Sequence, residues 1–204
     1  MQTRKKKVWT TRAMAMTAML GAVASVLMFL EFPLPFLIPS FVKLDFSELP
    51  ALIASFAIGP TSGVVVCLIK NLVNLPFSGS GGAGELCNFL LGCAFVLPAG
   101  LVYRRKKNRV GALLGSLCGA AASAVVSFPV NLYIIYPVYA NIFAPMDVII
   151  GAYQKLLPAA DTLWKCLLIF NLPFTMGKML VDTLLSFLIY KPLSRFIKGS
   201  DTAQ

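Results

Sequence analysis

Apolar stretches of about 20 residues, separated by short polar segments, constrain this chain more than any other feature of its sequence. Hydrophobic residues make up 58% of the 204 residues and charged residues only 13%, whereas charged residues form about 25% of an average soluble domain. A helix needs ~20 predominantly apolar residues to cross the hydrocarbon core of a bilayer. The sequence therefore predicts an all-α integral membrane protein, with a single membrane domain over residues 1–204.

Six transmembrane helices are expected between the charged segments. The second is short, because only about 11 residues, or ~16 Å of helix, separate Glu48 from the turn signal Gly59-Pro60, against a hydrocarbon core of ~30 Å. It must start earlier, near Val42, or lie inside the bundle without crossing it fully. The expected ranges are 13–30, 42–58, 61–77, 85–103, 110–136 and 163–190.

Lys and Arg residues gather in three clusters, within 4–12, 104–109 and 191–198. Cytoplasmic loops of membrane proteins carry an excess of Lys and Arg, so residues 1–12 are expected to form a basic cytoplasmic N-terminus and the C-terminus to be cytoplasmic as well. The net charge of +10 then reflects orientation and attraction to anionic membrane lipid, and no nucleic acid partner is expected. The predicted location is the plasma membrane, with multiple crossings.

Two outer loops are more strongly patterned than a simple connector. The first, 31–39, carries three prolines among large apolar residues, so it cannot be a helix interior, and we expect it to pack down as a lid. The second, 143–161, contains an apolar run at 148–150 that suits a short helix at the membrane interface. Composition alone leaves open the alternative that both loops only rest among lipid headgroups.

Polar residues on the sixth predicted helix indicate where a ligand binds. An ionisable group at mid-membrane costs ~2.5 to 3.5 kcal/mol and usually faces a bundle interior or cavity. Asn171, Thr175, Lys178 and Asp182 share one helical face. As an alternative, Lys178 and Asp182, four residues apart, could form an ion pair that only holds the helix in register.

Similar polar stripes lie at the outer halves of the fourth and fifth helices. A single Ser or Asn would more often bond to a neighbouring helix, but three stripes on consecutive helices favour one shared pocket that opens to the outside. Tyr133, Tyr136 and Tyr139 could add flat apolar walls, although tyrosines at a helix exit also suit the aromatic belt. The two stripes are Glu85, Asn88 and Gly92, and Ser123, Ser127 and Asn131.

Small residues mark a different surface on the first helix. Ala15, Ala18 and Ala22 recur at helical spacing, and Ala18 and Ala22 form a small-x-x-x-small pair that lets another helix approach closely. The sequence does not separate an internal partner from an external one. The glycine repeat at 111, 115 and 119 is expected to pack internally.

Residues that the chain lacks exclude several classes of function. It has no His, so no His-based triad or His metal ligand exists, and without a GxxxxGK[ST] segment it cannot hydrolyse ATP by a P-loop. Its five cysteines lie in or beside apolar segments without CxxC spacing, which favours small buried residues over metal ligands. We therefore expect no enzyme, no metal site and no cofactor.

Several further segments of the sequence form a recognisable set. They are KLDFSELP at 43–50, GP at 59–60 followed by KN at 70–71, GELCNFLLG at 84–92, NLY at 131–133 with YPVY at 136–139, and PFTMGK at 173–178. Together they resemble the substrate-binding S components of energy-coupling factor (ECF) vitamin transporters, specifically the riboflavin branch. The resemblance covers nearly the whole chain and is most specific at 43–50 and 84–92. In the similar segment at 173–178 we would expect Asn where Thr175 stands, although a hydroxyl can still donate and accept.

This resemblance implies a six-helix bundle that binds riboflavin with high affinity in an outer-facing pocket, for ATP-driven uptake. It also implies partners, namely a membrane coupling subunit and two ATPases that supply the energy. The pair Ala18 and Ala22, with Ala15, looks like the family's docking motif for the coupling subunit.

Eight polar residues are expected to bind the vitamin. The flat ring of riboflavin needs apolar walls and directional partners for its carbonyl and nitrogen edge, and its ribityl chain needs hydrogen-bonding groups. We expect Asn131 and Lys178 at the ring edge, with Thr175 and Asn171 in support. Near the ribityl end, or securing the lid, we expect Glu85, Asn88, Asp45 and Lys43.

Three other functions stay open. An S component for another vitamin would share the topology and differ in pocket residues. A stand-alone secondary transporter would usually carry internal repeats with broken helices, and we find none in the sequence. A small intramembrane enzyme would need a nucleophile or a metal constellation, for which a chain without His has few options.

Overall fold

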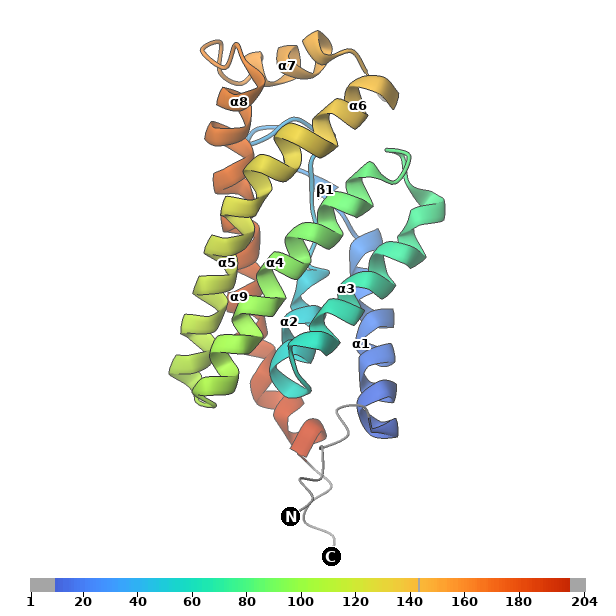
Figure 1. Cartoon of the computed structure of the whole chain (residues 1–204), viewed down its shortest axis with the longest axis vertical. Coiled ribbons are helices and arrows are strands. Elements are labelled where there is room, and N and C mark those ends of the chain that lie inside the picture. Colours follow the sequence, from blue (N-terminus) through green and yellow to red (C-terminus); the bar gives the residue numbers. More distant parts are fainter. Residues whose placement is uncertain (1–9, 143, 199–204) are drawn as a thin grey trace, which may run out of the picture.

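The computed structural model describes residues 10–142 and 144–198, with side chains up to residue 189. Long helices run side by side in a bundle, and a small hairpin and several short helices cover one end of it (Figure 1). In chain order the elements are α1 (Thr11–Phe29), β1 (Phe32–Pro33), β2 (Lys43–Leu44), α2 (Glu48–Ala57), α3 (Pro60–Asn74), a 3-10 turn η1 (Leu75–Phe77), α4 (Ala83–Arg105), α5 (Arg109–Val130), a π-helical turn η2 (Asn131–Ile135), α6 (Tyr136–Ile142), α7 (Met146–Gln154), α8 (Leu163–Cys166), a second π-helical turn η3 (Leu167–Asn171) and α9 (Leu172–Lys198).

Five helical segments in the described part of the chain are long and apolar enough to cross a membrane. The two longest are built from successive elements, because α5 continues through η2 into α6, and α8 continues through η3 into α9. The expected all-α membrane bundle is thus confirmed. The five segments are Thr11–Phe29, Pro60–Phe77, Ala83–Arg105, Arg109–Ile142 and Leu163–Ile189.

The second predicted helix is shorter than the expected range 42–58. α2 has ten residues, about 15 Å of helix, and cannot cross a ~30 Å core by itself. Lys43 and Leu44 are extended instead, because they pair antiparallel with β1. Every residue from Glu48 to Ser55 is buried, and α2 contacts α1, α3, α4 and α9. α2 therefore lies inside the bundle, the second of the two alternatives that its length left open.

Glycines let α4 and α5 pack closely. A Cβ atom at Gly115 would lie 2.5 Å from the carbonyl oxygen of Ala99, and one at Gly119 would lie 2.3 Å from that of Phe95. Any larger residue would force the two backbones apart. The glycine repeat packs internally, as predicted.

A buried ion pair holds the start of α2 against α3. The Lys70 Nζ lies 2.6 Å from the Glu48 Oε1, and both side chains are fully buried. Lys70 also donates to the Ser47 hydroxyl, which in turn bonds to the Asp45 carboxylate. Charges in such a setting need both the partner and these added hydrogen bonds.

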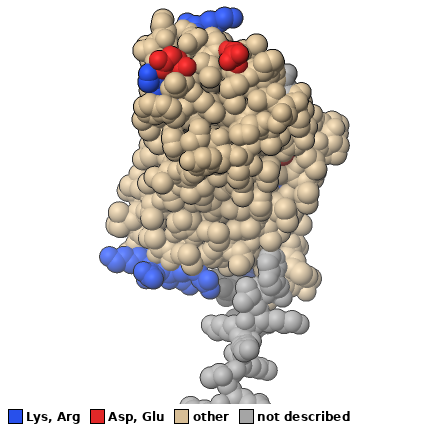
Figure 2. Space-filling model, turned by 45° about the horizontal axis from the view of Figure 1, so that its top comes forward, with Lys and Arg blue, Asp and Glu red and all other residues tan. Residues whose placement is uncertain are grey.

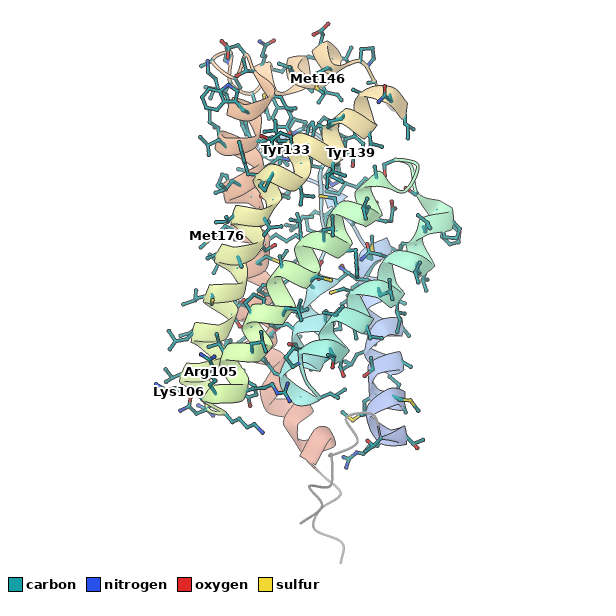
Figure 3. The ribbon with its side chains drawn as sticks, viewed as in Figure 1. Arg105, Lys106, Tyr133, Tyr139, Met146 and Met176 are labelled. Carbon is teal, nitrogen blue, oxygen red and sulfur yellow. The ribbon has the colours of Figure 1, made fainter. Side chains whose placement is uncertain are left out.

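The two ends of the bundle differ in charge. Arg105, the last residue of α4, and Lys106 lie at one end, here called the basic end (Figure 3). Lys and Arg gather there, whereas Asp and Glu accompany them at the opposite end (Figure 2). The hairpin β1–β2, α6 and α7 lie at the opposite end, here called the pocket end, whereas α1 begins and α9 ends toward the basic end (Figure 1). The first predicted basic cluster, apart from Arg12, lies outside the described residues. The third predicted basic cluster, 191–198, lies in α9, beyond the last residue whose side chain is described. A single domain over the whole chain stays a prediction.

The Lys70–Glu48 pair yields a stability prediction. Replacing Lys70 with Ala leaves the Glu48 carboxylate buried without a counter-charge, which costs at least ~3 kcal/mol and lowers the melting temperature by roughly 6 to 12 °C. The measurement is thermal unfolding of the purified protein in detergent. Lys165→Ala is the control, because its ion pair with Asp161 lies at the surface and its loss should change the melting temperature little. Equal melting temperatures for Lys70→Ala and wild type would contradict the prediction.

Candidate ligand-binding site

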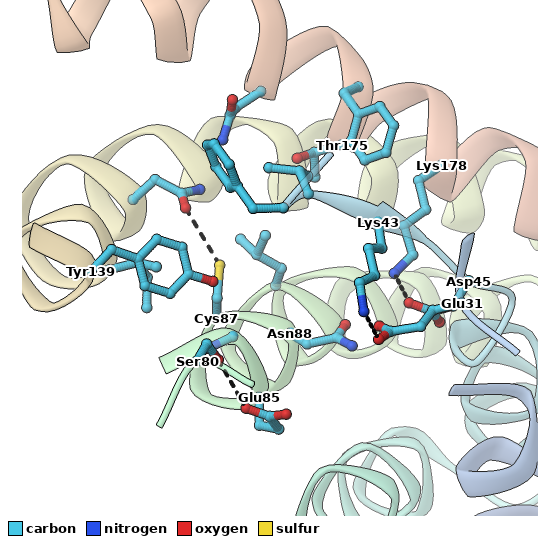
Figure 4. Close-up of a pocket in the computed structure, with 18 of the residues that line it drawn as sticks. Glu31, Lys43, Asp45, Ser80, Glu85, Cys87, Asn88, Tyr139, Thr175 and Lys178 are labelled. Atoms are coloured by element: carbon cyan, nitrogen blue, oxygen red, sulfur yellow. Dashed lines mark hydrogen bonds and ion pairs between the residues drawn. The ribbon is translucent and has the colours of Figure 1, made fainter. Parts of the chain in front are cut away.

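A cavity of about 490 Å³ lies toward the pocket end of the bundle, within the ~300 to 1,000 Å³ range of small-molecule sites. Its walls come from α1, the segment from the β1–β2 loop to the start of α2, the loop before α4, and α4, η2, α6, η3 and α9. All eight residues predicted to bind a ligand line this one cavity, although their roles stay predictions. Figure 4 labels all of them except Asn131 and Asn171. The eight are Lys43, Asp45, Glu85, Asn88, Asn131, Asn171, Thr175 and Lys178.

The loop between β1 and β2 forms the lid of the cavity. Residues 40–43 line the cavity, and of the proline-rich segment 31–39 that precedes them Glu31 lines it as well. Within 31–39, Ile38 is fully buried whereas Phe36 is 77% exposed. The Lys43 Nζ lies 2.5 Å from the Glu31 Oε1, which closes the base of the loop (Figure 4). The lid expected for 31–39 is therefore completed by the residues that follow it.

Two π-helical turns place an asparagine each in the cavity wall. Such turns occur frequently at functional sites, because they interrupt the regular helix. Asn131 begins η2 and Asn171 ends η3. The Asn131 Nδ2 donates to the Ser127 carbonyl at 2.7 Å, and its Oδ1 accepts a contact from the Cys87 thiol at 3.6 Å. The Asn131 amide is therefore oriented by its own helix and by α4.

Lys178 on α9 pairs with Asp45 and not with Asp182. Its Nζ lies 2.8 Å from the Asp45 Oδ2, and the two side chains are 10% and 5% exposed. Burial would raise the pKa of the Asp45 carboxyl, but the charges of Lys178 and Lys70 outweigh burial and hold that pKa below its usual range. This pair joins α9 to the segment that enters α2.

The alternative interpretation of the sequence, a Lys178–Asp182 pair within one helix, is wrong. Asp182 is fully buried, and neither of its carboxyl oxygens has a hydrogen-bond partner among the described residues. It does not line the cavity. The i, i+4 spacing allowed this pair, but the segment that follows β2 brings Asp45 to Lys178 from 133 residues away.

The polar stripe predicted on the fifth helix reaches the cavity only at Asn131. Ser123 donates to the Leu91 carbonyl at 3.0 Å and thus bonds to α4, while Ser127 donates to the Ala124 carbonyl of its own helix. Neither serine lines the cavity. The two serines of this stripe therefore bond within the helix bundle, and Asn131 alone of the three faces the cavity. Gly92, on the fourth helix, likewise packs against Glu48.

Aromatic side chains complete the walls. Tyr136 and Tyr139 line the cavity, as does Phe41 from the lid, whereas Tyr133 is 74% exposed and lies outside it. Sequence reasoning missed Phe41 and Cys87. Cys87 lies between Glu85 and Asn88 on the same turn of α4, and this position could have indicated that it lines the cavity.

Glu85 is held by the loop that precedes α4. The Ser78 hydroxyl donates to the Glu85 Oε2 at 2.6 Å, and the Ser80 hydroxyl lies 3.4 Å from the same oxygen. The loop needs glycine where it turns, since Gly81 and Gly82 have φ of 64° and 91°. Aromatic walls, amides, hydroxyls and two ion pairs can together hold a flat ligand with a polar edge and a hydrogen-bonding tail.

Comparisons with known proteins find a family model, similar sequences and a similar solved structure. The family model described as "ECF transporter, substrate-specific component" matches residues 12–190. The Staphylococcus aureus (strain TCH60) riboflavin transporter RibU is 32% identical over 195 residues, covering 96% of this chain and 97% of its own. The Bacillus subtilis (strain 168) riboflavin transporter FmnP is 31% identical, covering 94% and 97%.

A third relative, the riboflavin transporter RibU of Streptococcus thermophilus (strain ATCC BAA-250 / LMG 18311), is 33% identical over 207 residues and covers 94% of this chain and 90% of its own. Among solved structures, one titled "Structure and mechanism of the S component of a bacterial ECF transporter" superposes with a TM-score of 0.72. It is 30% identical, and the match covers 92% of this chain and 98% of the solved chain.

The partner of Lys178 can be tested by stability. Asp45→Asn removes the counter-charge of a largely buried ammonium group and should lower the free energy of unfolding by about 3 kcal/mol. Asp182→Asn removes no hydrogen bond seen in the structure and should not lower stability. Thermal unfolding of both variants in detergent measures the difference. Greater loss of stability in Asp182→Asn than in Asp45→Asn would restore the intrahelical pair.

Proposed function

The chain belongs to the substrate-specific components of ECF transporters, and from this membership we propose that it binds riboflavin in the cavity and mediates its uptake across the cell membrane. Three relatives named as riboflavin transporters, each aligned over at least 94% of this chain, support this ligand. The observation that carries the proposal is the convergence of eight polar residues from four separate parts of the chain on one cavity. The protein acts as a transport component rather than as an enzyme.

The roles of the cavity residues follow from their contacts. Asn131 presents an oriented amide to the ring edge, and Lys178 presents an ammonium group held in place by Asp45. The buried hydroxyl of Thr175 lies one helical turn from Lys178 and supports the same edge. Asn171 shapes the wall beside them.

The ribityl chain is assigned to the other polar groups of the cavity. Glu85 and Asn88 face it from the start of α4, at the pocket end. Lys43 closes the lid through Glu31, so its main role is to retain the ligand. A neutral polyol suits this part of the cavity, because hydroxyl groups can both donate to carboxylates and accept from amides.

The uptake proposal includes partner proteins. A membrane coupling subunit and two ATPases are expected to supply the energy. The exposed face of α1 supports a docking role, because Ala15, Ala18 and Ala22 are all exposed and small side chains let a second helix approach closely.

The proposed orientation places the pocket end outside the cell. The five basic residues in and beside the α4–α5 turn belong on the cytoplasmic side by the positive-inside rule. The N- and C-termini would then be cytoplasmic as well. The cavity would face the medium from which the vitamin is taken up.

Riboflavin binding is tested by titration of the purified protein, followed by quenching of flavin fluorescence. Saturable one-to-one quenching that excess thiamine or biotin does not reverse is the expected result. Asn131→Ala and Lys178→Ala should each weaken binding by at least ~1 kcal/mol, or about fivefold, because each removes a directional partner.

The matched controls replace the same residue types outside the cavity. Asn141 and Lys155 are exposed and do not line it, so Asn141→Ala and Lys155→Ala should bind like wild type. Wild-type affinity in both cavity variants would reject the assigned contacts. A folded wild type that does not quench riboflavin would reject the vitamin itself and favour an S component for another one.

Docking is tested by enlarging the small residues of α1. Ala18→Leu and Ala22→Leu should abolish ATP-driven uptake while leaving riboflavin affinity unchanged, because neither residue lines the cavity. Val23→Phe is the control, since Val23 is 52% exposed and points about 100° away from Ala22 around the helix. Parallel loss of binding in the alanine variants would indicate internal packing instead.

A further inference from the structure

Three buried polar groups beside the cavity form a closed ring of hydrogen bonds. They are Tyr136 of α6, Tyr153 of α7 and Asn171 of η3, exposed by 1%, 0% and 6%. The Tyr153 hydroxyl donates to the Asn171 Oδ1 at 2.6 Å, and the Asn171 Nδ2 donates to the Tyr136 hydroxyl at 2.9 Å. The two tyrosine oxygens lie 2.5 Å apart.

The direction of the third bond follows from the number of protons. A tyrosine hydroxyl carries one proton, and Tyr153 uses its proton on Asn171. Tyr136 must therefore donate to Tyr153. Burial raises the pKa of the Tyr153 hydroxyl, so this group keeps the proton that the ring needs. Each member both donates and accepts, an arrangement in which hydrogen bonds strengthen one another.

The ring also supports the lid. The Phe41 ring packs edge-on against Tyr136 and Tyr153, with centroids 6.4 and 5.9 Å apart, and against Tyr139 at 6.4 Å. Phe41, Tyr136 and Asn171 line the cavity, whereas Tyr153 does not. Tyr153 thus contacts three cavity-lining residues, from three parts of the chain, without facing the cavity itself.

We propose that Tyr153 is a positioning residue for the ligand: its hydroxyl holds Asn171 and Tyr136 in the cavity wall and its ring seats Phe41 of the lid, which slows escape of the bound vitamin. This inference rests on riboflavin as the ligand, as proposed above. It assigns a binding role to the short helix α7, which the sequence indicated only as an interfacial helix.

Opening the ring should accelerate release of riboflavin. Tyr153→Phe keeps the aromatic packing with Phe41 but removes two of the three hydrogen bonds. We expect the dissociation rate constant to rise about fivefold, the equivalent of one net hydrogen bond. The experiment loads purified protein with radiolabelled riboflavin and follows its release after a chase with unlabelled vitamin.

The rate constant separates positioning from general stability. A hydroxyl that only stabilises the fold would lower the fraction of protein that binds, and would leave the release rate of the bound fraction unchanged. Tyr133→Phe is the matched control, because Tyr133 is 74% exposed, and it should release riboflavin at the wild-type rate.

Tyr136→Phe opens the same ring from its other side, and it also tests the proposal if Tyr153→Phe does not fold. The double variant should release riboflavin no more than about twice as fast as either single variant, because groups that act as one network are not additive. Release within twofold of wild type from the folded Tyr153→Phe or Tyr136→Phe protein overturns the positioning role while riboflavin binding stands. Failure of wild type to retain riboflavin would instead overturn the ligand, and this inference with it.

Discussion

Removing ionisable groups from water inside a membrane is costly, and the arrangement of the cavity depends on how this chain compensates for that cost. Lys178 bonds to Asp45, Asp45 bonds to Ser47, and Ser47 and Glu48 both bond to Lys70. This chain of contacts links α9, the end of the lid, the start of α2 and α3. Because a buried charge is stable only with its partner, the elements that carry these residues are held in one relative position.

The same contacts explain why a ten-residue helix can sit inside the bundle. α2 is too short to reach both membrane surfaces, and the polar groups at its start lie inside the bundle, where water does not solvate them. Its first residue, Glu48, meets Lys70, and the extended pair β1–β2 carries the chain from α1 to that point. The lid is therefore a direct continuation of the segment that the ion pairs hold.

At the pocket end, neutral hydrogen bonds and aromatic packing take over from charge. The lid meets Tyr136, Tyr139 and Tyr153 through Phe41, and the two π-helical turns direct Asn131 and Asn171 into the wall. Ion pairs thus hold the two ends of the lid, and the aromatic cluster holds Phe41 within it. A ligand under this lid would contact groups that are already oriented, which lowers the entropy cost of binding.

Several features of the protein could be predicted because they depend on local chemistry. Long apolar stretches require helices that satisfy their own backbone groups in lipid, and polar residues at helical spacing require a non-lipid environment. That reasoning located the bundle and six of the eight predicted residues that line the cavity. Lys43 and Asp45 came instead from the resemblance of 43–50 to a known family. The glycine repeat of α5 was likewise predictable, since glycines at every fourth residue serve close packing.

Contacts between distant segments were decided only by the tertiary structure. Spacing within one helix offered Asp182 as an alternative partner of Lys178, but the segment between β2 and α2 brings Asp45 to that ammonium group. The ring of Tyr136, Tyr153 and Asn171 joins three elements whose separations carry no periodic signal. The sequence by itself determined which residues avoid lipid, because the cost of exposing a polar group to hydrocarbon is local. The choice of partner among those residues depended on how the helices and the lid pack, because an ion pair or hydrogen bond forms only between groups that the fold brings within about 3 Å.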